Sequence, residues 1–276
     1  MLVDLVRFKT KDKVELAGFI AGPGPAKQAI LYVHGLGSNF YKSRTEGLAQ
    51  VFQSLGWKFF SFNNRGHDGS ADSEDFKKCV YDISAAVNFI RRQGVREIVL
   101  AGHSTGCNKI VYTLAKKKLP GVCGVILLAG LSDPDIYKIE LGRRYSKLLK
   151  QAEKLVSVKE RHKYLLVGSG KYGAMTAARI VSLMKYGGPE DLFSLSLGKK
   201  AKARYLGLTM PTLVVYGTRD KHARHDVKKI GGFVAAQIPG PVKQVYIKGA
   251  DHGFRGFERR LVECILKWLG ALSSRA

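Results

Sequence analysis

The sequence predicts an α/β fold in which a mostly parallel sheet carries helices on both faces. Short apolar runs alternate along the chain with segments of helical periodicity, an order typical of parallel sheets with crossover helices. Several runs, such as AILYV at residues 29–33, are apolar throughout, as expected of strands buried on both faces. The alternation stops over residues 134–207, which carry amphipathic helical patterns and no clear strand. We therefore expect a core of residues 1–133 and 208–276 with a helical insertion at 134–207.

The first part of the chain supplies six of the expected strands. LVRFKT and VELAGFI, separated by Lys11–Lys13, predict an opening hairpin. Four further apolar runs follow, at residues 29–33, 57–62, 97–102 and 122–130. Helical patterns separate them near residues 43–55, 75–93 and 105–118. In the second helix one buried face is predicted from apolar residues spaced three or four apart: Phe76, Val80, Ile83, Val87 and Ile90.

The alternation resumes after the insertion and brings the expected number of strands to eight. TLVVYG at residues 212–217 and VKQVYI at residues 242–247 are the last two strands, with a helix near 227–236 between them. A final helix follows, and its buried residues are expected to be Phe254, Phe257, Leu261, Ile265 and Trp268.

The charge balance is strongly basic, with 46 Lys and Arg against 22 Asp and Glu and a net charge of +24. Such an excess favours anionic partners, but no nucleic-acid motif or basic tail accompanies it. We interpret it as a solvated lysine-rich surface and expect no nucleic-acid partner.

No apolar run reaches the roughly 18 residues of a membrane span, and no secretory signal is evident. The four cysteines lack disulfide or metal spacing, so we expect a cytoplasmic protein without a metal site.

The segment VLAGHSTGCNK changes from a strand pattern to a helical pattern at a single serine, Ser104. Gly102 and Gly106 flank it in the G-x-S-x-G arrangement of a nucleophile elbow. Such a turn strains the serine backbone, needs small residues two positions away on either side, and exposes the hydroxyl beside a helix N-terminus. A helix-capping serine in a glycine-rich turn is the simpler alternative. The strand–turn–helix context favours a nucleophile.

A serine nucleophile needs a general base, and the base needs an acid that orients it. After such an elbow the acid and then the base are expected on loops that follow later strands. Asp220 follows the strand TLVVYG and His252 follows VKQVYI, so we predict them as acid and base. The alternative acids are Asp133 and Asp226, and the alternative bases are His222 and His225.

Acyl transfer also requires hydrogen-bond donors for the oxyanion. We predict the backbone N–H groups of Thr105, which follows the nucleophile, and of Leu36 in the glycine-rich loop HGLGSNFY. His34 in this loop is expected to brace it rather than to react. In the loop NNRGHDGS, we expect Arg65, His67 and Asp68 to form a polar network around the pocket.

Four motifs together resemble the α/β-hydrolase superfamily across nearly the whole chain: His34-Gly35, Gly102-x-Ser104-x-Gly106, Gly217-x-x-Asp220 and Asp251-His252-Gly253. The strings HGLGSNFY, NNRGHD and GHSTGCNK are similar to a sparsely characterised esterase branch related to fungal siderophore-ester hydrolases. More generally the sequence resembles monoglyceride-lipase-like and feruloyl-esterase-like carboxylesterases. Cys107 departs from the commonest pattern, in which a second glycine often follows the elbow. The resemblance implies ester hydrolysis without a cofactor and a lid inserted after the sixth strand, where residues 134–207 fall.

These features predict a serine hydrolase that cleaves small or medium acyl or aryl esters through an acyl-enzyme. The same triad also serves thioester, amide and C–C bond hydrolysis, and a non-catalytic ligand receptor on this fold is a further alternative. The sequence leaves the oligomeric state open.

The expected lid is predicted to contribute much of the substrate wall. Of the insertion's charged residues, 16 are Lys or Arg and six are Asp or Glu. If some of the basic side chains line the entrance, anionic esters would be favoured. The predicted substrate-binding residues are His103, Tyr145, Met175 and Met184, with Leu141, Ile180 and Leu183 as further lid candidates.

Overall fold

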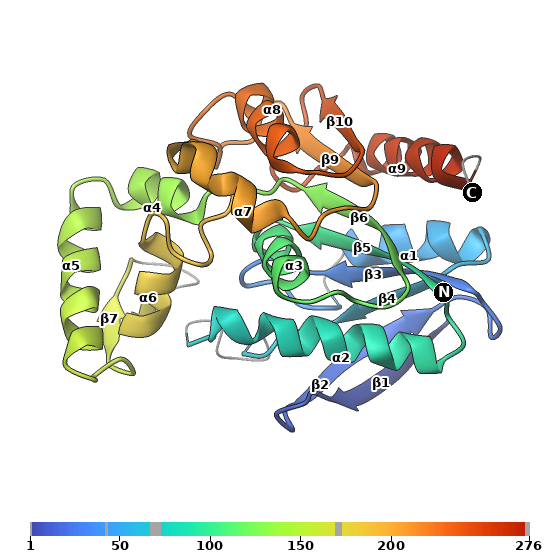
Figure 1. Cartoon of the computed structure of the whole chain (residues 1–276), viewed down its shortest axis with the longest axis horizontal. Coiled ribbons are helices and arrows are strands. Elements are labelled where there is room, and N and C mark those ends of the chain that lie inside the picture. Colours follow the sequence, from blue (N-terminus) through green and yellow to red (C-terminus); the bar gives the residue numbers. More distant parts are fainter. Residues whose placement is uncertain (1, 42–43, 67–72, 169–172, 274–276) are drawn as a thin grey trace.

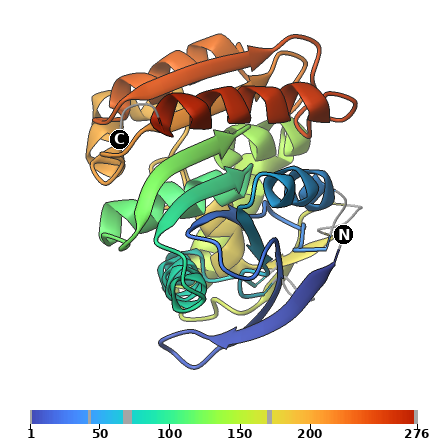
Figure 2. The same ribbon diagram turned by 90° about the vertical axis from the view of Figure 1, so that its right-hand side faces the viewer.

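A computed structural model describes residues 2–41, 44–66, 73–168 and 173–273 of the chain. Its centre is an eight-stranded sheet with the strand order β1-β2-β4-β3-β5-β6-β9-β10 (Figure 1). The first hairpin pairs antiparallel and joins β4 antiparallel, whereas every later pairing in this sheet is parallel. Figure 2 shows the two edges, with the blue β1–β2 hairpin at the bottom and β10 at the top. The strands are β1 (Val3–Lys9), β2 (Glu15–Ala21), β3 (Gln28–Val33), β4 (Lys58–Phe62), β5 (Glu97–His103), β6 (Val122–Leu128), β9 (Thr212–Gly217) and β10 (Val242–Ile247).

Helices cover both faces of this sheet, as the sequence predicts. On one face α2 (Cys79–Arg92), α3 (Thr105–Lys116) and α8 (Val227–Gln237) share a buried apolar cluster with the strands. On the other face α1 (Arg44–Ser54) and α9 (Glu258–Ser273) form a second cluster. The predicted helix near residues 75–93 opens with a 3-10 turn, η1 (Phe76–Lys78). The mostly parallel eight-stranded sheet predicted from the sequence is confirmed.

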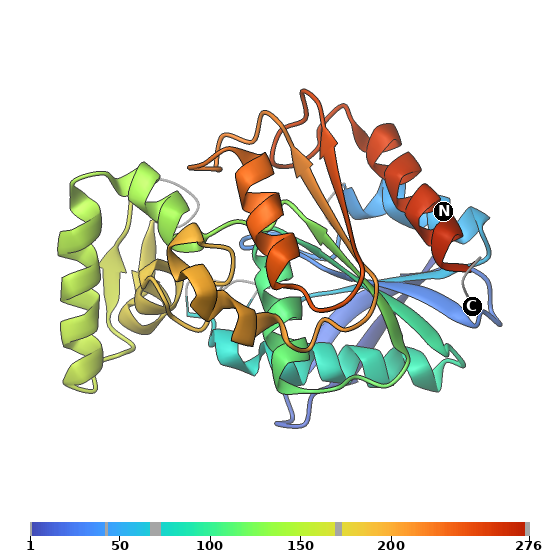
Figure 3. The same cartoon turned by 45° about the horizontal axis from the view of Figure 1, so that its top comes forward.

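The insertion after β6 projects from one side of the sheet (Figures 1 and 3). It contains α4 (Asp133–Leu141), α5 (Arg144–Ser157), the short strands β7 (Tyr164–Leu166) and β8 (Ala174–Thr176), and α6 (Ala177–Met184). These elements have an apolar cluster of their own, separate from the two clusters that flank the sheet. The insertion is therefore not purely helical, because β7 and β8 pair antiparallel.

The last part of the expected insertion packs differently from the rest. The 3-10 helix η2 (Leu195–Ala201) and α7 (Lys202–Tyr205) lie against the main sheet region, and the residues from 192 to 208 contribute buried side chains to its cluster. Phe193 and Tyr205 contact each other edge to face there, with ring centroids 6.2 Å apart. The projecting unit thus ends near residue 186, and we use the word lid for residues 133–186 below.

Crossover connections in a parallel sheet bring the loops at the carboxyl ends of the strands to one edge. The loops after β3, β5, β6, β9 and β10 therefore converge, and these are the loops that hold the predicted catalytic residues. Over the part of the chain that the structure describes, no helix has the length and apolarity needed to cross a membrane.

Candidate active site

Ser104 lies alone in the sharp turn between a strand and a helix. Strand β5 ends at His103 and helix α3 begins at Thr105. The backbone of Ser104 has φ +55° and ψ −126°, a conformation that residues other than glycine rarely adopt. Its N–H donates to the carbonyl of Leu128 on β6 at 2.9 Å, and its own carbonyl accepts from the N–H of Cys107 at 2.9 Å. Hydrogen bonds on both sides thus hold the serine in this strained turn.

Three glycines make room for the turn. A Cβ on Gly106 would lie 2.1 Å from the carbonyl oxygen of Val33, so helix α3 approaches β3 more closely than any side chain allows. A Cβ on Gly102 would lie 2.8 Å from the carbonyl group of Gly106. On the loop after β3, a Cβ on Gly35 would lie 2.9 Å from the Cβ of Ser104. The elbow and this loop are therefore in direct contact.

Asp220 and His252 meet at the carboxyl ends of β9 and β10. Nδ1 of His252 lies 2.7 Å from Oδ2 of Asp220. The Asp220 side chain is fully buried, and its Oδ1 accepts from the backbone N–H of His222 at 3.0 Å. The His252 side chain keeps 19% of its surface exposed. The carboxylate therefore fixes the imidazole by one nitrogen and leaves its other nitrogen free to face the cavity.

Ser104 and His252 line the same cavity, which has a volume of about 1100 Å³. Among the described residues there is no hydrogen bond between the two side chains. Hydrogen bonds between nucleophile and base are often long without substrate and tighten when it binds. The structure thus places Ser104 and His252 at one cavity, and Asp220 lies behind His252, which it contacts directly.

The predicted oxyanion donors lie beside Ser104. Leu36 and Thr105 both line the cavity. In the described part of the chain neither backbone N–H donates a hydrogen bond, so both remain available. The loop of Leu36 is closed by a hydrogen bond from Ser38 N–H to the Gly35 carbonyl at 3.2 Å. Leu36 also packs against the apolar cluster of the lid, which links this loop to the insertion.

Two further histidines surround His252. His103 Nε2 lies 2.8 Å from the carbonyl oxygen of His252, and the two ring centroids are 5.1 Å apart. His222 approaches from the loop of Asp220, with its ring centroid 4.9 Å from that of His252. Nδ1 of His222 also lies 3.7 Å from Oε1 of Glu140 on the lid helix α4. Of the four predicted substrate-binding residues, His103 is the one that lines the cavity.

Besides the strand ends and loops around Ser104, two groups of elements line the cavity. One group is the lid helix α4 with His222, and the other is the pair α1 and α9, which lie on the opposite side of the molecule from α4 (Figures 1 and 3). The lid contributes Asp133, Ile136, Tyr137 and Glu140, whereas α1 and the α9 region contribute Gly47, Leu48, Val51, Gly253, Phe254, Arg255, Glu258, Arg259, Leu261 and Val262.

Tyr145, Met175 and Met184 do not line this cavity. All three are buried in the lid's own cluster, where the hydroxyl of Tyr145 donates to the carbonyl of Met184. Ile180 and Leu183 are buried there as well. Their amphipathic pattern marks a buried face, and that face packs within the lid rather than over Ser104. No Lys or Arg of the lid's described residues lines the cavity either, so the basic entrance considered from the sequence is absent from this part of its wall.

The alternative acids and bases have other surroundings. Asp133 lines the cavity, but its Oδ2 accepts from the Asn108 amide at 3.3 Å and it makes no contact with His252. Asp226 caps helix α8 through the N–H of Lys228 at 2.7 Å. His225 is exposed and lies outside the cavity lining. None of these residues is paired with His252 in the described structure.

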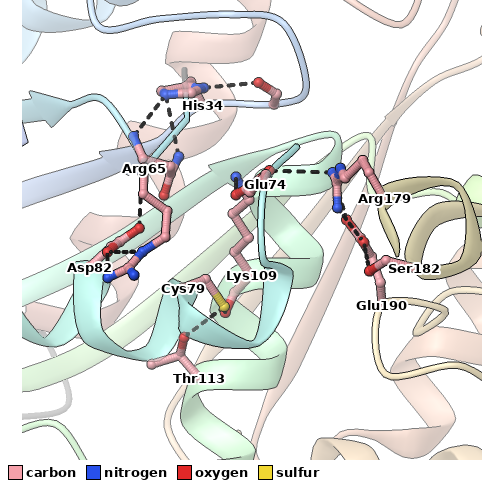
Figure 4. Close-up of polar contacts among 12 residues, drawn as sticks. His34, Arg65, Glu74, Cys79, Asp82, Lys109, Thr113, Arg179, Ser182 and Glu190 are labelled. Atoms are coloured by element: carbon pink, nitrogen blue, oxygen red, sulfur yellow. Dashed lines mark hydrogen bonds and ion pairs between the residues drawn. The ribbon is translucent and has the colours of Figure 1, made fainter. Parts of the chain in front are cut away.

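His34 and Arg65 support the loops behind the site. His34 is buried, with Nδ1 2.9 Å from the Gly35 carbonyl oxygen and Nε2 accepting from the Asn64 N–H at 3.2 Å (Figure 4). The Arg65 guanidinium binds Asp82 at 2.7 Å and Asp12 at 2.8 Å. Its hydrogen bonds and charge hold the pKa of the Asp12 carboxyl well below its usual range. Two other residues of the expected network, His67 and Asp68, lie outside the described residues.

The residues described in the structure include no group of three or more His, Cys, Asp or Glu side chains arranged to hold a metal ion. The four cysteines are free, and burial raises the pKa of the Cys79 and Cys107 thiols well above the ordinary value. Neither thiol is therefore an available nucleophile at neutral pH.

Comparison with protein-family models gives one match to most of the chain. The family described as "Protein of unknown function (DUF1749)" matches residues 11–261. The chain belongs to the DUF1749 family. Among curated proteins, this DUF1749 member is 29% identical over 89 residues to "Putative esterase/lipase 2" of Mycoplasma pneumoniae. The match covers 32% of each protein, so the chain spans about a third of the length of this relative.

Solved structures share the fold over almost the full length of the DUF1749 chain. The siderophore hydrolase EstB from Aspergillus fumigatus superposes with a TM-score of 0.73 and 19% identity, covering 93% of this chain and 95% of EstB. The α/β hydrolase GrgF from Penicillium sp. sh18 gives a TM-score of 0.73 and 15% identity, covering 98% of both chains. The fold is that of the α/β-hydrolases, as the sequence motifs indicate.

Sequence reasoning did not identify the part of the cavity wall that α4 forms. Ile136, Tyr137 and Glu140 follow β6 within one short helix, and the first turn of that helix carries Asp133. A helix that starts directly at the carboxyl end of a central strand has its N-terminal turn at the edge where active sites form. The start of α4 directly after β6 therefore indicates that this helix lines the site.

Proposed function

We propose that the protein is a serine hydrolase that cleaves carboxylic esters with Ser104, His252 and Asp220 as its triad. The single observation that carries the proposal is the strained backbone of Ser104 between β5 and α3, in a cavity shared with a histidine that a buried aspartate holds at 2.7 Å. Strained residues of this kind persist where the surrounding structure enforces them, often at functional sites. The esterase and hydrolase names of similar proteins agree with this function.

In the first step the Ser104 oxygen attacks the ester carbonyl and passes its proton to the free ring nitrogen of His252. A bond forms between the serine oxygen and the carbonyl carbon, and the carbonyl oxygen becomes an oxyanion. Asp220 keeps the imidazole in the required tautomer because its carboxylate accepts from Nδ1–H, and it stabilises the imidazolium that forms.

The oxyanion is stabilised by the N–H groups of Leu36 and Thr105. Both groups lie in the cavity wall next to Ser104 and have no acceptor among the described residues. Donors fixed before the reaction stabilise the developing charge without a reorganisation cost. Collapse of this intermediate releases the alcohol, which takes its proton from His252. Water then attacks the acyl-enzyme with His252 as base, and the acid leaves.

The test is covalent labelling combined with turnover. Wild-type protein, Ser104→Ala and the control Ser54→Ala are treated with a fluorophosphonate probe and assayed with p-nitrophenyl acetate, butyrate and octanoate. Ser54 is an exposed serine on α1 whose hydroxyl donates to the Val51 carbonyl. Wild type and Ser54→Ala are expected to be labelled and active, and Ser104→Ala to lose both properties. Turnover by Ser104→Ala at the wild-type rate would overturn the assignment.

A further inference from the structure

One buried carboxyl group in the cavity wall takes no part in the proposed chemistry. Asp133 is the first residue of the lid helix α4, follows β6 closely, and has only 4% of its surface exposed. Its Oδ2 accepts one hydrogen bond, from the Asn108 amide at 3.3 Å. Among the described residues no group donates to its other oxygen, Oδ1. Asp133 therefore presents an unused hydrogen-bonding atom at the wall of the cavity that contains Ser104.

Two nearby cations, Lys109 and Arg179, are paired with glutamates, and Figure 4 shows Arg179 between Glu74 and Glu190. Lys109 Nζ lies 2.5 Å from Glu74. Arg179 on the lid helix α6 lies 2.7 Å from Glu190 and 3.3 Å from Glu74. These four side chains are fully buried and form what we call the ionic cluster: Glu74, Lys109, Arg179 and Glu190.

Burial is the main influence on the protonation of Asp133. It raises the pKa of the carboxyl well above the ordinary value, and the charge of Glu190 raises the pKa further, whereas the charges of Arg179 and Lys109 lower it without cancelling the effect of burial. The carboxyl therefore tends to keep its proton, and a protonated carboxyl both donates and accepts hydrogen bonds.

The charges around Asp133 exclude one class of ligand. The lid part of the wall also contains the carboxylate of Glu140 and, among its described residues, no Lys or Arg. The two arginines of the wall, Arg255 and Arg259, belong to the α9 side. A carboxylate or phosphate group on the lid side would face acids without a cation to neutralise it. A hydroxyl or ammonium group would find an acceptor.

We propose that Asp133 is a specificity-determining residue that binds a hydroxyl or ammonium group of the ester on the lid side of the cavity. This proposal rests on the proposed esterase function and names its substrate class: esters with a hydrogen-bond donor on one chain. Apolar chains would occupy the opposite side, where Leu48, Val51 and Leu261 line the wall.

Binding of the two donor groups would differ in whether Asp133 releases its proton. A hydroxyl donates to Oδ1 while Asp133 keeps its proton, so nothing is released. An ammonium group binds the ionised carboxylate, so the carboxyl proton passes to water and a buried ion pair forms. The preference for an ammonium ester over its apolar analogue should therefore rise with pH, whereas the preference for a hydroxyl ester should not.

The experiment uses esters that differ only in one terminal group, which is methyl, hydroxyl or ammonium. One set carries this group on the alcohol chain and a second set carries it on the acyl chain, and hydrolysis is followed by pH-stat titration. The proteins are wild type, Asp133→Asn, Asp133→Leu and the control Asp226→Asn, each checked for folding by circular dichroism. Asp226 is exposed and caps α8 outside the cavity.

Wild type should prefer the hydroxyl or ammonium ester in one of the two sets. Asp133→Leu should lower the ratio of kcat/KM for the preferred ester to kcat/KM for the methyl ester about tenfold or more, mainly through KM. Asp133→Asn, which still donates and accepts, should keep the hydroxyl ester and lose the ammonium ester with its pH dependence. Asp226→Asn should behave as wild type.

The outcomes separate this proposal from the proposed function. If wild type hydrolyses the methyl esters but shows no preference that depends on Asp133, the specificity role is wrong and the esterase function stands. If Asp133→Asn loses all three esters equally while it remains folded, Asp133 acts in catalysis or in shaping the site, and the specificity role is also overturned. If wild type hydrolyses no ester, the proposed function fails and this inference fails with it.

Discussion

Two buried carboxylates of this protein each pair with a basic side chain, but one pair lies at the cavity and the other is completely buried. Asp220 holds His252 at 2.7 Å, and that histidine keeps 19% of its side chain exposed at the cavity. Glu190 holds Arg179 of the lid helix α6 at 2.7 Å, and both side chains are completely buried. A histidine gains and loses a proton near neutral pH, whereas an arginine remains charged. Under the proposed mechanism the contact of Asp220 serves proton transfer, whereas the equally short contact of Glu190 holds a side chain of the lid.

The largest expected effect comes from the Asp220 site. Asp220→Asn should lower kcat for ester hydrolysis about 10⁴-fold, because the amide cannot hold His252 in the tautomer that accepts the serine proton. The thermal midpoint should change little, since the amide nearly matches the carboxylate in volume. The measurement is steady-state kinetics with p-nitrophenyl butyrate beside a thermal unfolding curve.

The matched controls are Asp133→Asn and Asp226→Asn, which replace the alternative acids. Neither touches His252 in the described structure, so both should retain most of the activity toward this apolar ester. A mild Asp220→Asn together with an inactive but folded Asp133→Asn would move the acid of the triad to the loop after β6.

Substitutions in the ionic cluster should change the stability of the protein rather than its catalytic rate. Arg179→Met leaves Glu190 buried without its partner, a change that typically costs about 3–5 kcal/mol. Urea unfolding monitored by circular dichroism would measure the loss. Lys185→Met is the matched control, because Lys185 pairs with Glu153 at 2.8 Å on the surface of the same lid. Exposed pairs contribute about 0–1 kcal/mol.

The contrast between the two sites would be lost if Arg179→Met destabilised the protein no more than Lys185→Met. In that case the buried ion pairs would not attach the lid, and packing of the apolar cluster alone would hold it.

A smaller effect is expected at the contact between the loop after β3 and the nucleophile. Gly35→Ala would place a methyl group 2.9 Å from the Cβ of Ser104, so the loop or the serine must shift. Misplacement of reacting groups by about 1 Å lowers rates on the order of 10²-fold, and kcat should fall toward that limit. Gly24→Ala is the control, because a Cβ there meets no atom within 4 Å. Equal kcat values for the two variants would show that the Ser104 contact tolerates displacement.

Local sequence rules were sufficient to predict Ser104 as the candidate nucleophile and Asp220 and His252 as its candidate partners. The demand for small residues around Ser104 is confined to five positions, and Asp220 and His252 each follow an apolar run that forms a parallel strand. The strand pattern predicted the sheet because its central strands are buried on both faces. The contact of His252 with Asp220 depends only on neighbouring strand ends, so strand order was enough to expect it.

Local sequence rules were not sufficient to predict the contacts of the lid. Met175 and Met184 lie on amphipathic segments, and the pattern marks a buried side without saying which surface buries it. The strands β7 and β8 have three residues each, too short to show an alternating pattern. The ionic cluster joins residues 74, 109, 179 and 190, and in a chain with a net charge of +24 a lysine or arginine is expected at the surface. Only tertiary structure brings such residues together.

The left-handed backbone of Ser104 lowers the stability of the fold, although the proposed activity requires a serine at this position. A conformation of this kind costs on the order of 1–3 kcal/mol, and the surrounding strands and glycines must supply it. A glycine at position 104 would adopt the same turn without that cost but would have no hydroxyl. The elbow is therefore a place where the most stable version of the chain and the reactive version differ, and the rigidity of the sheet is what allows the less stable one to persist.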